Sequence, residues 1–333
     1  MAIRHIVAAD IGGTNALVEL LAEAEGNCET VDTHLFRSQA FASPEALLEE
    51  FFRRPAIRGI AARIEGACLS VAGHVHDGVS TLTNLGWLVD AAALGARFRI
   101  PRFEVINDFA ANAAAIPTLG DADLLTLQRG EPDPHGNRVV VGAGTGLGCS
   151  FLTWREGKHR MHGSEAGHID FAATDAEQDA LLAYLRGALG RVSYERIVSG
   201  SGLPRILSFL EASGAGNPSP QLLEAIKHGD APAVIAEYGL GKRDPLAVRT
   251  LEMFVSIYGA FAGNLALATL ASGGVYIAGG VARRNARQFE EGGFIRAFSD
   301  KGRFSALLRR YPVHLVTDPR LGVRGAVAHL LAD

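Results

Sequence analysis

Two polar residues, Asn107 and Asp108, follow the apolar run 103–106 and precede an alanine-rich segment. This pattern places them where a strand ends and a helix begins. Both residue types commonly cap helices, and capping alone would explain their presence. The carboxyl ends of strands in α/β sheets are also where ligands bind. Asp108 could therefore accept the proton of a substrate hydroxyl whose oxygen attacks phosphorus.

Two glycine-rich turns, residues 10–15 and 142–148, have a composition that suits phosphate. Glycine allows positive φ and brings backbone N–H groups close to an anion, and successive N–H groups form a concave anion site. Tight hairpins without a ligand are the alternative. Neither turn matches a dinucleotide fingerprint, and the sequence contains no P-loop. Beside the first turn, the Asp10 carboxylate could hold Mg²⁺, through water.

A third group of candidates comes from the segment 163–170, where Glu165 and His168 stand three residues apart between glycines. The histidine spacing fits no standard zinc pattern, which disfavours a metal site. We expect Glu165 and His168 to bind the hydroxyls of a polyol. Glu195 precedes another glycine turn at 199–202, and by itself it is best explained as an acid in the first turn of a helix.

Short apolar runs bounded by glycine or polar turns must position these residues. Runs of this kind are typical of strands that are covered on both faces of a sheet, and longer helical patterns lie between them, which predicts an α/β fold. The predicted strands are 5–9, 67–71, 103–106, 138–141, 275–278 and 313–316, and the predicted helices include 43–52, 109–116, 175–189 and 246–271.

An internal similarity suggests that the chain contains two related domains. HIVAADIGGTNALVELL near the start resembles RVVVGAGTGLGCSFLTW from Arg138 onward, and each reads as a strand, a glycine turn ending in Gly-Thr, and a second strand. A repeated hairpin indicates two copies of one unit. A cleft between two α/β domains is a common place for a small-molecule site.

Composition and charge exclude several classes of protein. The 333 residues are 48% hydrophobic and 20% charged, with a net charge of −4 and no long run of one sign, so neither a nucleic-acid coat nor a polybasic membrane anchor is expected. Three well-separated cysteines favour a reduced, cytoplasmic protein. Residues 253–282 carry no charge and could formally span a membrane, but we expect a buried helix at 250–271 followed by a strand.

Taken together, the motifs resemble the bacterial-type glucokinase family, ATP:D-glucose 6-phosphotransferases of the actin-like ATPase (hexokinase–Hsp70–actin) fold. The resemblance runs nearly end to end, and the motifs keep the family's order. They are DIGGTN at 10–15, LTNLGW at 82–87, INDFAA at 106–111, GAGTGLG at 142–148, GSEAGHIDF at 163–171, YERIVSGSGL at 194–203, IAGGVARR at 277–284 and DKGRF at 300–304.

The resemblance implies a role for each matching residue. Asp108 would be the general base toward the glucose 6-hydroxyl, and Asn107, Asp108, Glu165, His168 and Glu195 would bind the sugar. The ATP side would comprise Asp10, near Mg²⁺, then Gly12, Gly13, Thr14, Asn15, Gly144, Thr145, Gly146, Gly279 and Gly280. No protein-bound metal other than the Mg²⁺ that accompanies ATP is expected.

The family pattern also implies two ribonuclease H-like α/β domains with a cleft between them. The small domain would comprise 1–118 plus 318–333, and the large domain 119–317. The product would be glucose 6-phosphate, formed in the first step of glycolysis by a homodimer in the cytoplasm. No nucleic-acid or membrane partner is expected.

The sequence departs from the family at one loop, because many members have Ala-Gly-Pro where this chain has Ala72-Gly73-His74. The related ROK sugar kinases carry a cysteine-rich zinc motif that is absent after His168. A kinase for another hexose or amino sugar, a polyphosphate-dependent kinase and a catalytically silent sugar sensor remain as alternatives.

Overall fold

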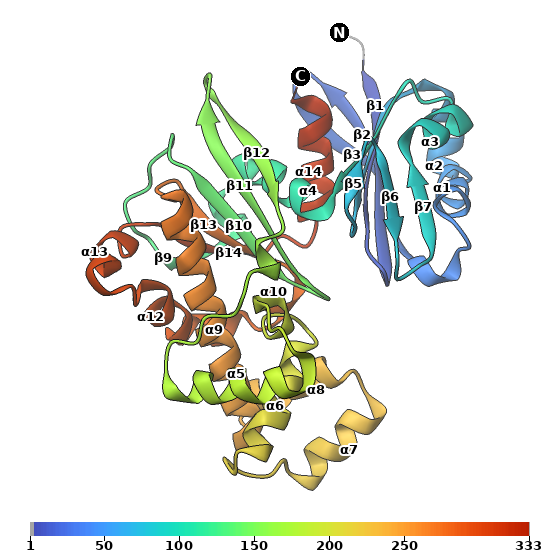
Figure 1. The fold of residues 1–333 in the computed structure, drawn as a ribbon. Helices are drawn as coiled ribbons and strands as arrows, with labels where there is room; N and C mark the ends of the chain where they lie inside the picture. The colour runs from blue at the N-terminus through green and yellow to red at the C-terminus, as the bar shows by residue number, and fades with distance from the viewer. Residues whose placement is uncertain (1–2, 333) are drawn as a thin grey trace. The chain divides into compact units, whose positions relative to one another are not determined.

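A computed structural model describes residues 3–332, and its internal contacts divide the chain into two units. Unit 1 contains the described residues up to Leu119 together with those from Asp318 onward, and unit 2 spans Gly120–Thr317. Each unit contains one large sheet with helices packed on it (Figure 1).

The sheet of unit 1 places its most apolar strands in the middle. The strand order is β3 (Asn27–Arg37), β2 (Asn15–Ala24), β1 (Arg4–Ile11), β4 (Ile64–Val71) and β8 (Arg102–Asn107). The first three strands are antiparallel neighbours, whereas β1, β4 and β8 run parallel. β1 and β4 are nearly continuous apolar runs because helices cover both of their faces.

Alternate residues of β1 enter two different cores. Val7, Ala9 and Ile11 pack with α1 (Pro44–Phe52), α2 (Pro55–Arg58) and α3 (Ala91–Phe98), together with residues of a small antiparallel sheet. Ile6 and Ala8 pack with α4 (Asp108–Ala115) and α14 (Leu321–Leu331) on the other face. The small sheet comprises β5 (Val75–His76), β6 (Val79–Leu82) and β7 (Trp87–Asp90).

The sheet of unit 2 repeats the topology of unit 1. Its order is β12 (Lys158–Ser164), β11 (Leu147–Arg155), β10 (Arg138–Ala143), β13 (Gly274–Ala278) and β14 (Val313–Val316), with β9 (Leu124–Gln128) added antiparallel at the edge. The hairpin β10–β11 occupies the same place in this order as β1–β2 does in unit 1. The predicted repeat of one hairpin is therefore confirmed.

Most of the helices lie in unit 2. They are α5 (Ala176–Leu189), α6 (Gly202–Ala212), α7 (Pro220–His228), α8 (Ala231–Leu240), α9 (Pro245–Thr269), α10 (Gly280–Arg284), α11 (Ala286–Glu290), α12 (Gly293–Ser299) and α13 (Ser305–Leu308). Short 3₁₀ turns in the two units are η1 (Ser38–Ala40), η2 (Ala61–Arg63), η3 (Ile116–Thr118), η4 (Asp121–Asp123), η5 (Ala166–His168), η6 (Tyr194–Arg196) and η7 (Gly302–Phe304).

Helix α9 is long and apolar enough to cross a membrane, yet 72% of its most apolar window is buried inside the protein. It is the core helix of unit 2, and it begins one residue before and ends two residues before the predicted 246–271. The helix ends at Thr269 because Leu270 adopts the left-handed conformation, with φ of 51°. Gly259 and Gly263 let α12 approach closely, as a close-packed helix pair requires.

We expect Gly259→Ala to lower the free energy of unfolding by about 1–3 kcal/mol, the usual range for overpacking. A Cβ at this position would lie 2.2 Å from the carbonyl oxygen of Phe294, which is backbone and cannot rotate away. The matched control is Gly187→Ala in α5, where a Cβ would meet nothing within 4 Å. That control is expected to stabilise the protein by roughly 0.5–1 kcal/mol. Thermal and urea unfolding measure both, and equal shifts would contradict the packing argument.

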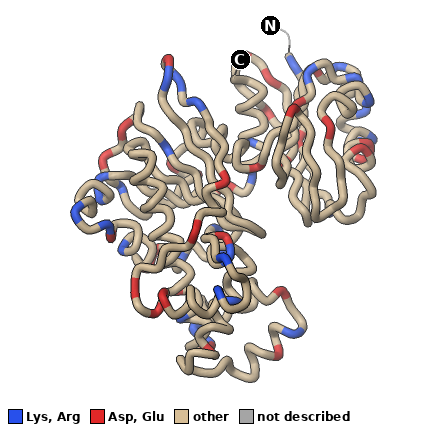
Figure 2. The backbone as a smooth tube through the Cα atoms, in the orientation of Figure 1, with Lys and Arg blue, Asp and Glu red and all other residues tan. Residues whose placement is uncertain are grey.

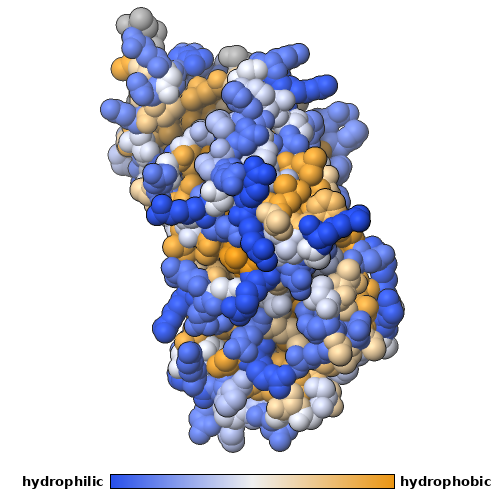
Figure 3. Space-filling view, turned by 90° about the vertical axis from the view of Figure 1, so that its left-hand side faces the viewer, coloured by the Kyte–Doolittle hydropathy of each residue, from blue (hydrophilic) through white to orange (hydrophobic). Residues whose placement is uncertain are grey.

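Charged side chains of both signs are interspersed along the backbone of each unit (Figure 2). On the face shown in Figure 3, apolar residues form separate patches among hydrophilic ones. Large exposed apolar side chains such as Leu35, Leu88 and Phe304 lie far apart in the sequence.

Candidate active site

In unit 1, the carboxyl ends of three parallel strands bring the first candidates to one sheet edge. Ile11 of β1 pairs with Val71 of β4, and Val71 pairs with Asn107 of β8. Asp10 and Asp108 therefore flank the same edge, although they are distant in sequence. This is the edge at which α/β proteins bind ligands.

Asn107 caps helix α4. Its side-chain oxygen accepts hydrogen bonds from the N–H groups of Phe109 (2.9 Å) and Ala110 (3.3 Å). Its Nδ2 donates to the carbonyl oxygen of Gly73 at 2.9 Å, so it also fastens the loop in which this chain carries His74. The capping interpretation of Asn107 is confirmed, whereas its contact with sugar stays a prediction.

Asp108 is the first residue of α4, and its Oδ1 accepts a hydrogen bond from the N–H of Phe109 at 2.9 Å. Burial, and to a smaller extent the negative charge of Asp10, raise the pKa of the Asp108 carboxyl to about 7, although hydrogen bonds from Phe109 N–H and neighbouring groups oppose the shift. A carboxylate with a pKa near neutrality is a much stronger base than an ordinary exposed aspartate.

The Asp10 carboxylate is enclosed by two parts of unit 1 that are far apart in sequence. Ser70 Oγ donates to Asp10 Oδ1 at 3.0 Å, and burial raises the pKa of Asp10 while this hydrogen bond opposes the shift. On its other side stands Gly322, in the first turn of α14, where a Cβ would lie 2.4 Å from Asp10 Cγ. Only glycine allows the C-terminal helix to approach this carboxylate so closely.

The tip of the β1–β2 hairpin has backbone N–H groups that are available to bind a ligand. Gly12 N–H donates to Asn15 O at 2.9 Å, and Ser38 binds the carbonyl oxygens of both Gly12 and Thr14. Within residues 3–332, the N–H groups of Gly13 and Thr14 have no hydrogen-bond partner. Adjacent unpaired amides beside fixed carbonyls form an anion-binding concavity.

The tip of the β10–β11 hairpin in unit 2 has the same property. Gly144 N–H donates to Gly146 O, and Gly200 N–H donates to Gly144 O, both at 2.8 Å. Among the described residues, the N–H groups of Thr145 and Gly146 have no hydrogen-bond partner. Each unit thus carries one hairpin tip that can accept phosphate oxygens.

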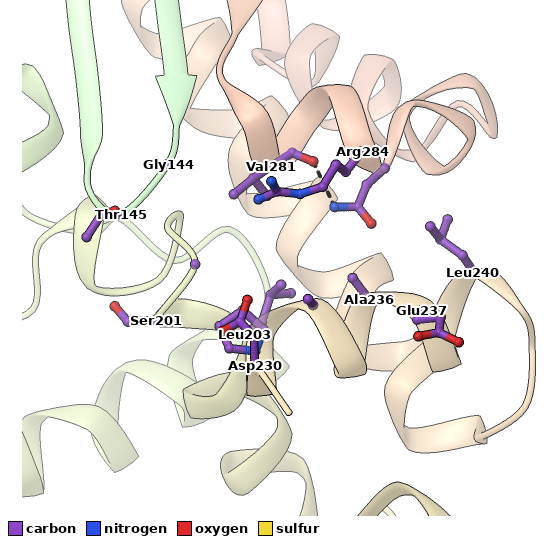
Figure 4. Close-up of a pocket in the computed structure, with 14 residues that line it drawn as sticks. Gly144, Thr145, Ser201, Leu203, Asp230, Ala236, Glu237, Leu240, Val281 and Arg284 are labelled. Atoms are coloured by element: carbon purple, nitrogen blue, oxygen red, sulfur yellow. Dashed lines mark hydrogen bonds between the residues drawn. The ribbon is translucent and has the colours of Figure 1, made fainter. Parts of the chain in front are cut away.

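A cavity of about 580 Å³ opens beside this second hairpin, with Thr145 at the hairpin tip and Arg284 across from it (Figure 4). Its walls are mostly apolar, which suits a flat heterocyclic base. The lining residues are Gly144, Thr145, Gly200, Ser201, Leu203, Asp230, Pro232, Ala233, Ala236, Glu237, Leu240, Val281, Arg284 and Asn285.

The wall that α8 contributes was not foreseen from the sequence, because Pro232, Ala236 and Leu240 look like ordinary core residues of a helix. Gly279 and Gly280, which the family resemblance places on the ATP side, do not line this cavity. Gly279, with φ of 90°, packs against β10, where a Cβ would lie 2.6 Å from Ala143 O. It turns the chain from β13 into α10, which then presents Val281 and Arg284 to the cavity.

The three remaining candidates lie together in unit 2. The imidazole of His168 lies 3.9 Å from a carboxylate oxygen of Glu165 and 3.9 Å from one of Glu195. Glu165 and His168 are exposed, whereas the Glu195 side chain is only 27% exposed and accepts the N–H of Leu147 at 3.1 Å. The cluster therefore presents two acids and one imidazole, which suits hydroxyl groups.

The family model of glucokinase matches residues 7–333. The glucokinase of Nostoc punctiforme is 35% identical over 96% of this chain and 97% of its own length. A solved glucokinase from an Antarctic psychrotroph is 33% identical, with a TM-score of 0.84 over 99% of each chain.

A ROK family glucokinase from Streptomyces griseus, solved with glucose and AMPPNP, has a TM-score of 0.62 at 20% identity over 98% of each chain, which shows the common fold. That fold is the two-domain actin-like ATPase architecture expected from the motifs. The chain belongs to the glucokinase family.

Proposed function

We propose that this chain transfers the γ-phosphoryl group of ATP to the 6-hydroxyl of D-glucose, with Asp108 as the general base. The observation that supports the assignment of the base most directly is the raised pKa of the Asp108 carboxyl, about 7, because a general base works best when its pKa lies near the operating pH. Its place at the carboxyl edge of β8 is where a bound substrate is expected.

The nucleotide side of the proposal uses both hairpins. The unpaired amides of Gly13, Thr14, Thr145 and Gly146 would bind phosphate oxygens, and the apolar cavity beside the second hairpin would take the adenosine. The Streptomyces griseus relative carries AMPPNP on the same fold, which agrees with this assignment.

Asp10 is the residue that we propose faces Mg²⁺. Carboxylate oxygens are the ligands that Mg²⁺ prefers, and the charge of Asp10 already raises the pKa of Asp108, so the edge carries negative charge that a cation would offset. When bound with ATP, Mg²⁺ neutralises charge on the phosphates. Gly322 and Ser70 keep the Asp10 carboxylate in place for that contact.

The sugar would be held by Glu165, His168 and Glu195, with Asn107 beside the base. A hydrogen bond from a hydroxyl to a charged partner contributes about 1.5–3 kcal/mol. An epimer that leaves one of these groups unpaired would therefore be rejected. Asp108 then orients the 6-hydroxyl and takes its proton as the new bond from oxygen to phosphorus forms and the bond to ADP breaks.

An ADP-release assay with a panel of sugars tests this proposal. The panel contains glucose, mannose, fructose, glucosamine and N-acetylmannosamine, each with ATP and with polyphosphate as donor. We expect glucose with ATP to give the highest kcat/KM. A higher value for another sugar or for polyphosphate would overturn the substrate assignment, and glucose binding without ADP would indicate a sugar sensor.

The homodimer and the cytoplasmic location stay predictions that rest on the family resemblance and on the separated cysteines. Light scattering coupled to size exclusion tests the first of these, with a mass twice that of the chain as the expected result.

A further inference from the structure

We propose that the tip of the β10–β11 hairpin positions Glu195, so that nucleotide binding and sugar binding strengthen each other through Gly146 and Leu147. The inference rests on the proposed function, because it assigns the sugar to Glu195 and the nucleotide to the hairpin. It adds a positioning role for Leu147, which contacts neither substrate in that assignment, and for Gly146, whose amide is assigned there to phosphate alone.

The Glu195 carboxylate has a different neighbour at each oxygen. Its Oε2 accepts the Leu147 N–H at 3.1 Å, whereas its Oε1 lies 3.9 Å from Nδ1 of His168. One oxygen is thus held by the hairpin, and the other faces the cluster that would bind the sugar. A shift of the hairpin would move the carboxylate that the sugar uses.

Both segments that carry the proposed sugar-binding residues contact the backbone of Leu147. Glu195 takes its N–H, and Gly167, which adjoins His168, packs on its carbonyl so tightly that a Cβ would lie 1.9 Å from the oxygen. Both segments that carry the sugar candidates, η5 and η6, are therefore anchored on one hairpin residue.

The opposite side of the same hairpin tip belongs to the nucleotide cavity. Gly144 and Thr145 line that cavity, and the next residue, Gly146, faces Glu195, because a Cβ there would lie 2.6 Å from Oε2. Gly144 N–H donates to Gly146 O at 2.8 Å, so the residue that lines the cavity is linked directly to the residue that faces Glu195. Phosphate that fixes the tip would consequently fix Glu195.

Coupling between two sites is reciprocal, and typical values are about 5–150-fold in affinity. We expect the Kd for glucose to fall at least ~5-fold when AMPPNP and Mg²⁺ are present, and the Kd for AMPPNP to fall by the same factor with glucose. Isothermal titration calorimetry of the full chain measures all four constants.

Two glycine variants of the hairpin distinguish displacement of Glu195 from a general distortion of the hairpin. Gly146→Ala should weaken glucose binding without nucleotide by at least ~10-fold and reduce the coupling factor to about 1, because the new Cβ displaces the carboxylate. Gly144→Ala is the matched control, since a Cβ there meets no atom within 4 Å, and glucose affinity without nucleotide should not change. Equal glucose constants in the two variants would overturn the inference.

Variants of Glu195 test the same coupling independently, which matters if Gly146→Ala does not fold. Glu195→Gln keeps an acceptor for the Leu147 N–H, so coupling should persist even though glucose binds more weakly. Glu195→Asp is one methylene shorter and loses that contact, so coupling should disappear. Wild-type coupling in Glu195→Asp would overturn the inference.

The outcomes for this inference and for the proposed function can be told apart. If the chain phosphorylates glucose but shows none of these effects, the inference fails and the proposed function stands. If the chain binds neither substrate, the proposed function itself is refuted.

Discussion

Asp108→Asn is expected to lower kcat by a factor of about 10²–10⁴, the range that general base catalysis contributes. The amide is nearly isosteric with the carboxyl, so it can keep the hydrogen bond from Phe109 N–H and its place at the start of α4. It cannot accept the proton of the 6-hydroxyl. Steady-state kinetics with glucose and ATP measure the loss, and calorimetry measures the Kd for glucose, which should stay within a few-fold of the wild-type value.

We also expect Asp108→Asn to change the pH dependence of stability, an effect that the loss of a catalytic group alone would not produce. The pKa of Asp108 is raised in the folded state, so the folded state is favoured by this group below the unfolded pKa, and that advantage is lost as the pH rises toward 7. Above that pH the partly buried charge of Asp108 opposes folding. Asp108→Asn should therefore have a higher Tm than the wild type in mildly alkaline buffer. Near-normal turnover in this variant would refute the assigned base.

The second large effect concerns pH. Because Asp108 must be ionised to act as a base, kcat/KM should fall about tenfold for each pH unit below about 7 and reach a plateau above it. Burial is the main cause of the raised pKa, and the charge of Asp10 adds to it. The acidic limb of the profile should accordingly lie well above the range of an ordinary aspartate.

Asp10→Asn tests the cause of that shift. The variant removes the second negative charge at the sheet edge, so the pKa of Asp108 should fall and the acidic limb should move to lower pH. Its absolute rate should also fall if Asp10 faces Mg²⁺, but the position of the limb does not depend on that loss. Ser70→Ala is a useful comparison, because it removes only the hydrogen bond to Asp10 and keeps both charges. An acidic limb that stays in place in Asp10→Asn would show that Asp10 does not influence the base.

Local sequence was a reliable guide wherever an element is fixed by its own pattern. The strand 313–316 and the helix 175–189 match the structure to within one residue. Strands β3 and β12 were not predicted, because they lie at sheet edges with mostly exposed side chains and lack a continuous apolar run. The cavity wall from α8 was missed for the opposite reason, since apolar residues beside a ligand site look the same as apolar residues in a core.

The sequence motifs alone indicated the family, the repeated hairpin of the α/β fold and the residue types available for chemistry. They could do so because a glycine turn or a strand end is encoded by residues that lie within a few positions of each other. Only the tertiary structure decided how those residues influence one another. The pKa of Asp108 depends on Asp10, which parallel strand pairing brings to the same edge, and the approach of Gly322 to Asp10 joins the two ends of the chain. The hydrogen bond from Leu147 to Glu195 arises likewise from packing between distant segments. Charge and contact act through space, so residues far apart in sequence acquire their chemistry only when the sheets and helices have assembled.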